Sequence, residues 1–216
     1  MYRHAPKLDG MESVKYVIDK SIPGCFIECG VQGGDFEDIW IKTLLSRGCV
    51  RDIYMFDTFA GMTEPGKYDY TRADATIYQN TQNEVYNIWK KNAIDDTTND
   101  WCYTSLRDVK FRLQKNNYPK ENLHYVVGDV MKTLSDPSNI PPQIAILRLD
   151  TDWYESSKYE LEVLYSNVSQ GGVVVFDDYF HWDGQRRATD EFFAAWGLTP
   201  TIIPVGNQKT GYMIKN

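Results

Sequence analysis

Short apolar segments alternate with amphipathic helical segments along most of this 216-residue chain, and this alternation limits the fold more than any other feature. Buried strands are predicted at residues 25–29, 52–56, 123–127, 144–149 and 173–179, and a closing hairpin at 201–205 and 211–214. Strands that alternate with helices form a mainly parallel sheet covered on both faces, and a closing hairpin makes one strand antiparallel. We therefore expect one α/β domain over residues 1–216, with a doubly wound, mostly parallel seven-stranded sheet and an antiparallel C-terminal hairpin strand.

Helices are predicted wherever apolar residues between these strands recur at helical spacing. The predicted helices cover residues 8–21, a segment from the turn after the first strand through Trp40 to Leu45, and residues 82–95, 105–117, 153–168 and 185–196. Apolar positions on the N-terminal helix, within residues 1–22, suit a partner subunit, so a homo-oligomer is one of the expectations.

Charge and hydropathy disfavour two kinds of partner. The net charge is −7 and no window forms a clustered basic patch, which a nucleic-acid surface needs. No apolar run approaches the about 18 residues of a membrane span, and no apolar leader is present, so we expect a cytoplasmic protein. Cys25 and Cys29 would lie roughly 13 Å apart in one strand, too far for a disulfide, and the four cysteines are expected to be reduced.

The first strand ends in a glycine-rich turn with the sequence ECGVQGGD, residues 28–35. Glycine permits positive φ angles and a close approach of a ligand to the backbone. The pattern is not the dinucleotide fingerprint G-x-G-x-x-G, because Gln32 interrupts it. The acid Glu28 would repel a phosphate and suits a ligand with a cationic amine. Two interpretations stay open, a ligand site and a merely tight turn.

Acids also follow the second and third strands. Asp57 stands where nucleoside-binding α/β folds pair a carboxylate with ribose hydroxyls, although it could simply form a turn. Gly128 and Asp129 end the third strand and would close the same pocket, unless Asp129 only caps the next turn.

Four carboxylates follow the fourth and fifth strands, namely Asp150, Asp152, Asp177 and Asp178. Neighbouring parallel strands would bring them together at one edge of the sheet, where their mutual repulsion raises their pKa values unless a positive charge lies among them. A hard divalent cation such as Mg²⁺ fits this set of donors, and capping of the following helix is the simpler alternative. His181 follows closely and would be a surface residue or a neighbour of the site.

These motifs together resemble a known family. The stretches ECGVQGG, FDTFAGM, LRLDTDWYES and GGVVVFDDY are similar to those of the class I S-adenosylmethionine-dependent methyltransferases, which have a Rossmann-like fold, and more closely to the TylF/MycF family of macrocin-type sugar O-methyltransferases. The likeness covers about residues 24–193. It implies a Mg²⁺-dependent transfer of a methyl group from S-adenosylmethionine to a hydroxyl of a sugar or of another natural-product or polysaccharide acceptor.

The resemblance also implies roles for single residues. Glu28 and Gly30 would contact the methionine part of the cofactor, Asp57 the ribose and Asp129 the adenine side. The whole cofactor-binding set is then Glu28, Gly30, Gly33, Asp57, Thr58, Phe59, Gly128, Asp129 and Asp150. The metal ligands would be Asp150, Asp177 and Asp178.

The base that removes the hydroxyl proton is less clear from the sequence. Catechol-type enzymes of this class use a lysine three residues after the first metal-binding aspartate, and here that position is Trp153. Asp150 and His181 are our first candidates for the catalytic base, and Asp152 is a further one.

Residues 58–117, called the insert from here on, carry many aromatic residues, among them Tyr78, Trp89 and Trp101. We expect the insert to form a lid over the acceptor, since long loops in compact domains are usually functional or disordered; an ordinary packing insert is the alternative. Two other functions are also considered. A nicotinamide-dependent oxidoreductase is disfavoured by Gln32, and a non-catalytic binding protein on a methyltransferase scaffold is disfavoured by the intact strand-end acids.

Overall fold

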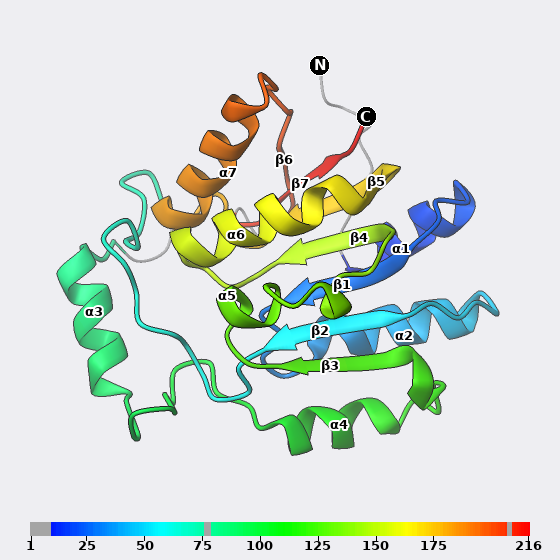
Figure 1. Ribbon diagram of the computed structural model, residues 1–216, viewed down its shortest axis with the longest axis horizontal. Coiled ribbons are helices and arrows are strands. Elements are labelled where there is room, and N and C mark those ends of the chain that lie inside the picture. Colours follow the sequence, from blue (N-terminus) through cyan, green and yellow to red (C-terminus); the bar gives the residue numbers. More distant parts are fainter. Residues whose placement is uncertain (1–9, 76–78, 207–208) are drawn as a thin grey trace.

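The computed structural model describes residues 10–75, 79–206 and 209–216, and these form one seven-stranded sheet flanked by helices (Figure 1). The strands are β1 (Cys25–Cys29), β2 (Ile53–Asp57), β3 (Leu123–Val127), β4 (Ile144–Leu149), β5 (Val168–Phe176), β6 (Ile203–Pro204) and β7 (Gly211–Ile214). Their order across the sheet is β3-β2-β1-β4-β5-β7-β6. The strands β1 to β5 are mutually parallel, and β7 runs antiparallel to both of its neighbours. The predicted doubly wound, mostly parallel α/β sheet is confirmed.

Helices cover both faces of this sheet. The α-helices are α1 (Gly10–Asp19), α2 (Asp35–Ser46), α3 (Gln82–Lys91), α4 (Leu106–Gln114), α5 (Val130–Thr133), α6 (Tyr154–Leu164) and α7 (Asp183–Ala195). Three short 3₁₀ turns lie at Lys120–Asn122, Pro137–Asn139 and Tyr165–Asn167. In Figure 1, α5 and α6 lie in front of the sheet and α1 and α2 lie behind it, whereas α3 lies beyond the carboxyl-terminal ends of the strands.

Two apolar cores hold these layers together, one on each face. On one face, the sheet is covered by Val14 and Val17 of α1, Trp40 of α2, and Val109 and Leu113 of α4. The ring of Trp40 lies edge-on to that of Phe26. On the other face, side chains of α5, α6 and α7 pack together, including Phe193. Because β1 and β4 are covered on both sides, all of their residues are buried, which explains their nearly continuous apolar sequences.

The strand register places the polar strand ends together. Cys29, the last residue of β1, pairs with Leu149 of β4, and Leu149 pairs with Phe176 of β5. Cys29 also pairs with Phe56 on its other side. The residues that follow these four positions therefore emerge at one edge of the sheet, which is the edge where open α/β folds bind ligands.

The elements around β5 differ from the prediction. The helix expected at 153–168 ends at Leu164, and β5 begins at Val168, ahead of the two glycines that were expected to precede the strand. Gly171 has a φ of +79°, and the pairing register of β4 with β5 shifts at this point. The glycines thus form a bulge inside the strand instead of a boundary. The short helix α5 was not expected, and β6 is shorter than the predicted 201–205.

The insert is packed against the rest of the domain. Trp101 of the insert forms edge-to-face contacts with Trp153 and Trp182. The indole N–H of Trp153 donates to the carbonyl oxygen of Thr63 (3.0 Å), which ties the first part of the insert to the start of α6. Of the residues singled out for the lid, Tyr78 lies outside the described residues.

Two further observations concern the chain as a whole. The four cysteines carry free thiols, as predicted, and Cys25 and Cys29 are buried. Within the ranges that the structure describes, no helix has both the length and the apolar character to cross a membrane.

Candidate active site

A cavity opens at the carboxyl-terminal edge of the sheet and is lined by strand ends and by the insert residues Met62, Thr63 and Cys102. Of the site residues predicted from the sequence, nine line this cavity: Gly30, Asp57, Thr58, Gly128, Asp129, Asp150, Asp152, Asp177 and Asp178. The other four, Glu28, Gly33, Phe59 and His181, do not belong to its lining. The cavity is also lined by residues that the sequence did not single out, including Thr151 and Ser156.

The turn after β1 needs a glycine at position 30. Its φ is +88°, and a Cβ atom at this position would lie 2.1 Å from the carbonyl oxygen of Asp150. Only glycine therefore lets the backbone after β1 pass so close to the backbone after β4. A tight turn alone is therefore enough to explain the glycine at position 30. Gly30 and Gln32 of this turn also line the cavity.

Asp57 ties the end of β2 to this turn. Its Oδ2 accepts the amide N–H groups of Val31 (2.7 Å) and Gln32 (2.9 Å), and its Oδ1 accepts that of Phe59 (2.6 Å). Three charge-assisted hydrogen bonds hold the carboxylate in one orientation at the cavity wall. Phe59 itself is buried in the apolar core.

At the end of β3, Asp129 caps the helix that follows, which was the simpler of its two interpretations. Asp129 is the N-cap of α5, where its Oδ1 accepts the amide N–H of Met131 (3.0 Å). Asp129 lines the cavity beside Gly128. Gly33 lies on the outer side of the turn after β1, where its carbonyl oxygen accepts a hydrogen bond from Arg112.

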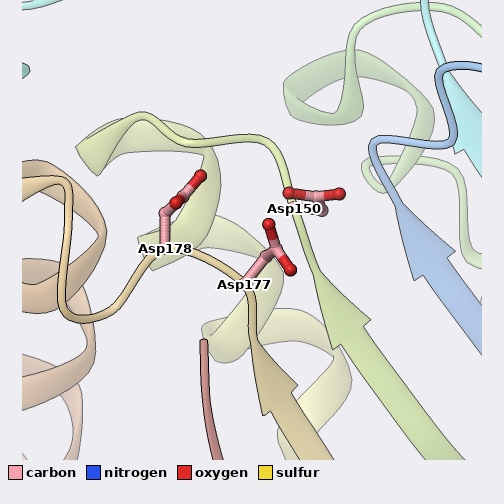
Figure 2. A group of neighbouring side chains, drawn as sticks. All are labelled: Asp150, Asp177 and Asp178. Atoms are coloured by element: carbon pink, nitrogen blue, oxygen red, sulfur yellow. The ribbon is translucent and has the colours of Figure 1, made fainter. Parts of the chain in front are cut away.

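The carboxylates after β4 and β5 come together. Figure 2 shows Asp150 beyond the end of β4, and Asp177 and Asp178 beyond the end of β5. One oxygen of each carboxylate lies within 4.8 Å of the others, and Oδ1 of Asp178 is buried without a hydrogen-bond partner among the described residues. Such a set of hard oxygen donors, with one oxygen left unsatisfied, fits a hard divalent cation.

Asp178 is held in place from α7. The side chain of Gln185 accepts the amide N–H of Asp178 (2.7 Å) and donates to the carbonyl oxygen of Leu149 (3.0 Å). Burial, together with the charge of Asp177, raises the pKa of Asp178 to about 6. Burial also raises the pKa of Asp150 well above its usual range, and the guanidinium of Arg148 opposes this rise.

Arg148 is the residue of this cluster that the sequence analysis missed. Its side chain is 3% exposed, and it donates hydrogen bonds to Glu28, Asp150 and Asp177. A positive charge of the protein itself therefore lies among the carboxylates, a role that the sequence analysis assigned to a metal ion alone. A charged residue inside the otherwise apolar strand ILRL was the signal that could have revealed it.

Glu28 lies beneath the cavity. It is 2% exposed, its Oε1 accepts a hydrogen bond from Arg148, and the carboxyl group of Glu37 in α2 lies near it. Burial raises the pKa of Glu28 well above its usual range and that of Glu37 to about 7. The guanidinium of Arg148, which donates to Glu28, opposes the rise in the pKa of both carboxyl groups.

The candidate bases differ in their access to the cavity. Asp152 lines the cavity with a φ of +67°, and burial with the nearby charge of Asp178 raises its pKa well above its usual range. His181 is buried behind Asp178, to whose carbonyl oxygen it donates its amide N–H (2.8 Å). Burial lowers the pKa of His181 to about 4, so its ring is neutral at neutral pH.

Comparison with known proteins identifies the family. The model of the macrocin-O-methyltransferase (TylF) family matches residues 6–213, which is nearly the whole chain. The chain belongs to this TylF family. It is an O-methyltransferase, as the resemblance of its motifs implied, and S-adenosylmethionine is the methyl donor of the class.

Individual relatives support this assignment. The chain is 27% identical over 196 residues to the demethyldecarbamoylnovobiocin O-methyltransferase of Streptomyces niveus, and this aligned region covers 90% of the chain and 67% of that protein. It is 26% identical over 201 residues to an 8-demethyl-8-(2,3-dimethoxy-alpha-L-rhamnosyl)-tetracenomycin-C 4'-O-methyltransferase of Streptomyces olivaceus. This aligned region covers 92% of the chain and 69% of that protein.

Solved structures of similar proteins share the fold. The O-methyltransferase NovP has a TM-score of 0.76 and 24% identity over 96% of this chain and 78% of its own. The calicheamicin methyltransferase CalS11 has a TM-score of 0.65 and 18% identity over 94% of this chain and 76% of its own. The fold of this chain is therefore that of a class I O-methyltransferase.

Proposed function

We propose that this enzyme transfers the methyl group of S-adenosylmethionine to a hydroxyl of a sugar or of another natural-product acceptor, with Mg²⁺ bound by Asp150, Asp177 and Asp178. The observation that carries the proposal is the cavity itself, in which the glycine turn and Asp57 face the three aspartates. The names of the relatives support the class of acceptor, since one acts on a rhamnosyl tetracenomycin and another on mycinamicin III at its 3'' position.

The cofactor would occupy the side of the cavity formed by β1, β2 and β3. The backbone of the turn at Gly30 would face the methionine part, Asp57 the ribose hydroxyls and Asp129 the adenine. Because three amide N–H groups already orient the Asp57 carboxylate, it would meet the ribose without a further loss of side-chain entropy.

The acceptor would then lie between the aspartates and the insert. Met62, Thr63 and Cys102 form the wall of the cavity on that side. Contacts of Trp101 and Thr63 with Trp153 hold this wall against the start of α6, so the insert would define the shape of the acceptor site. This supports the prediction that residues 58–117 cover the acceptor, as a segment packed against the rest of the domain.

Methyl transfer breaks the bond between the sulfonium sulfur and the methyl carbon, forms a bond between that carbon and the acceptor oxygen, and releases the hydroxyl proton. Mg²⁺, when bound, would supply Lewis acidity that lowers the pKa of the acceptor hydroxyl. A carboxylate at the cavity would take the proton, and both candidates, Asp150 and Asp152, line it. Asp152 is favoured, because Asp150 would already be shared between Arg148 and the metal. His181, the other candidate base, would need to reach the cavity from behind Asp178.

The test is turnover with a panel of acceptors. The purified chain is incubated with S-adenosylmethionine, Mg²⁺ and free sugars, nucleotide-linked deoxysugars or glycosylated aglycones, and products are analysed by mass spectrometry. For glycosidic acceptors we expect a product heavier by one CH₂ unit, because the methyl group replaces the hydroxyl proton, and S-adenosylhomocysteine in equal amount. Methylation of simple phenols alone would contradict the proposed acceptor class, and no binding of S-adenosylmethionine would contradict the proposed reaction.

A further inference from the structure

The guanidinium of Arg148 connects three strands at the floor of the cavity. Arg148 lies on β4 and pairs in register with Glu28 of β1. Its Nη1 donates to Oε1 of Glu28 and to Oδ2 of Asp150, and its Nη2 donates to Oδ1 of Asp177. Two of the three proposed metal ligands are therefore attached to the two terminal nitrogens of one side chain.

The plane of this guanidinium is held as well. The ring of Phe36, from α2, lies 3.7 Å from the guanidinium carbon, in the geometry of a cation–π contact. Stacking on an aromatic ring and a rigid fork of donors are properties that arginine has and lysine lacks. Arg148 is thus fixed by one aromatic ring and by the carboxylate of Glu28, neither of which belongs to the cavity lining.

This arrangement divides the oxygens of the two aspartates between two tasks. Arg148 occupies Oδ2 of Asp150 and Oδ1 of Asp177, and the hydroxyl of Thr210 also donates to the latter oxygen (3.1 Å). The second oxygen of each carboxylate is left outside this pairing and belongs to a residue that lines the cavity. Each aspartate therefore offers one oxygen in a direction that the guanidinium sets.

We propose that Arg148 is a positioning residue of the enzyme, which orients Asp150 and Asp177 so that the metal site is assembled before an ion binds. This inference rests on the proposed function, because it assumes that the aspartates hold Mg²⁺. Groups that orient metal ligands from behind typically change metal affinity about 10–100-fold when they are replaced.

A simpler role for Arg148 would be to neutralise buried carboxylates without orienting them. A buried ion pair by itself is weak evidence for a functional role, because an apolar replacement of both partners is often neutral for stability. If neutralisation were the whole role, any single positive charge would serve. If orientation is the role, the charge must come from two nitrogens at a fixed separation, and lysine cannot provide them.

The Arg148→Lys variant separates the two roles. Calorimetric titration of the full chain with Mg²⁺ gives the metal affinity, and titration with S-adenosylmethionine checks that the cofactor site is intact. We expect Arg148→Lys to bind Mg²⁺ about 10–100-fold more weakly than the wild type, with cofactor affinity unchanged. Arg51→Lys is the matched control, because Arg51 also forms a fork, to the carbonyl oxygens of Gly24 (2.8 Å) and Ile22 (3.0 Å), far from the cavity.

A second variant serves if the lysine disturbs the fold. The double variant Glu28→Met and Arg148→Met replaces both partners of the buried pair with apolar volume, so neither is left buried without the other. We expect it to fold and to bind Mg²⁺ more weakly, because Asp150 and Asp177 have lost their common anchor. Metal binding as tight as in the wild type, in either folded variant, overturns the inference and leaves the proposed function intact. A wild type that does not bind Mg²⁺ overturns the proposed metal site itself.

Discussion

Replacement of Asp57 by asparagine changes a single atom type and has a calculable cost. The Oδ2 of Asp57 accepts two amide N–H groups, from Val31 and Gln32, and its Oδ1 accepts one, from Phe59. An asparagine has one acceptor oxygen, so the arrangement that keeps the two bonds to the turn points an NH₂ group at the amide of Phe59. The variant loses one charge-assisted bond and leaves a donor facing a donor, for which we expect a loss of about 2–4 kcal/mol in the free energy of unfolding.

Equilibrium urea unfolding of the full chain measures this loss. Asp129→Asn is the matched control, because Asp129 accepts a single amide N–H as the N-cap of α5 and asparagine caps helices equally well. We expect the control to change the free energy of unfolding by less than about 0.5 kcal/mol. Equal effects of the two substitutions, or a silent Asp57→Asn, would refute the assignment of Asp57 as the anchor of the turn.

Two further predictions concern the sheet edge and the pH dependence of stability. Gly30→Ala should lower the free energy of unfolding by at least about 2 kcal/mol, because its Cβ would meet the Asp150 carbonyl. The control Gly48→Ala, whose Cβ meets nothing within 4 Å, should lower it by about 1 kcal/mol for its positive φ alone. Equal losses in urea unfolding would contradict this prediction. Burial raises the pKa of Glu160 from 4.5 to about 8, so between these values the folded protein holds a proton that the unfolded chain releases. The stability that this proton contributes is fully present below about pH 4.5 and is lost as the pH rises through about 8. Urea unfolding from about pH 5 to about pH 9 should therefore show wild-type stability falling relative to Glu160→Gln, and parallel curves for the two proteins would contradict it.

The sheet and the edge that carries the cavity could be predicted because both depend on local sequence pattern. An apolar run such as residues 144–149 between a proline pair and an acid is sufficient to identify a buried strand. Once the strands are parallel, the residues after them must emerge at one edge, so Asp57, Asp129 and Asp150 could be assigned to one cavity before any coordinates were known.

The pairing of charges across the sheet could not be predicted in the same way. Arg148 faces Glu28 because β4 lies beside β1, although 120 residues separate them in the sequence, and no local pattern encodes that neighbour. The bulge at Gly171 was missed for a related reason, because two glycines at a predicted boundary look the same whether they precede a strand or bend it. Glu37 shows the same limit, since an acid in the first turn of a helix is usually exposed and this one is fully buried.

The measurement that tests the account most directly is a pair of calorimetric titrations, with S-adenosylmethionine and with Mg²⁺, on the wild type and on Asp178→Asn. Asp178 lines the cavity, belongs to the group of three aspartates, and has a buried oxygen without a partner among the described residues, so its charge should serve the metal and not the cofactor. We predict that the wild type binds both ligands and that Asp178→Asn retains cofactor binding while its affinity for Mg²⁺ falls at least about tenfold. Equal Mg²⁺ affinity in the two proteins would contradict the metal site, and a wild type that does not bind S-adenosylmethionine would contradict the account as a whole.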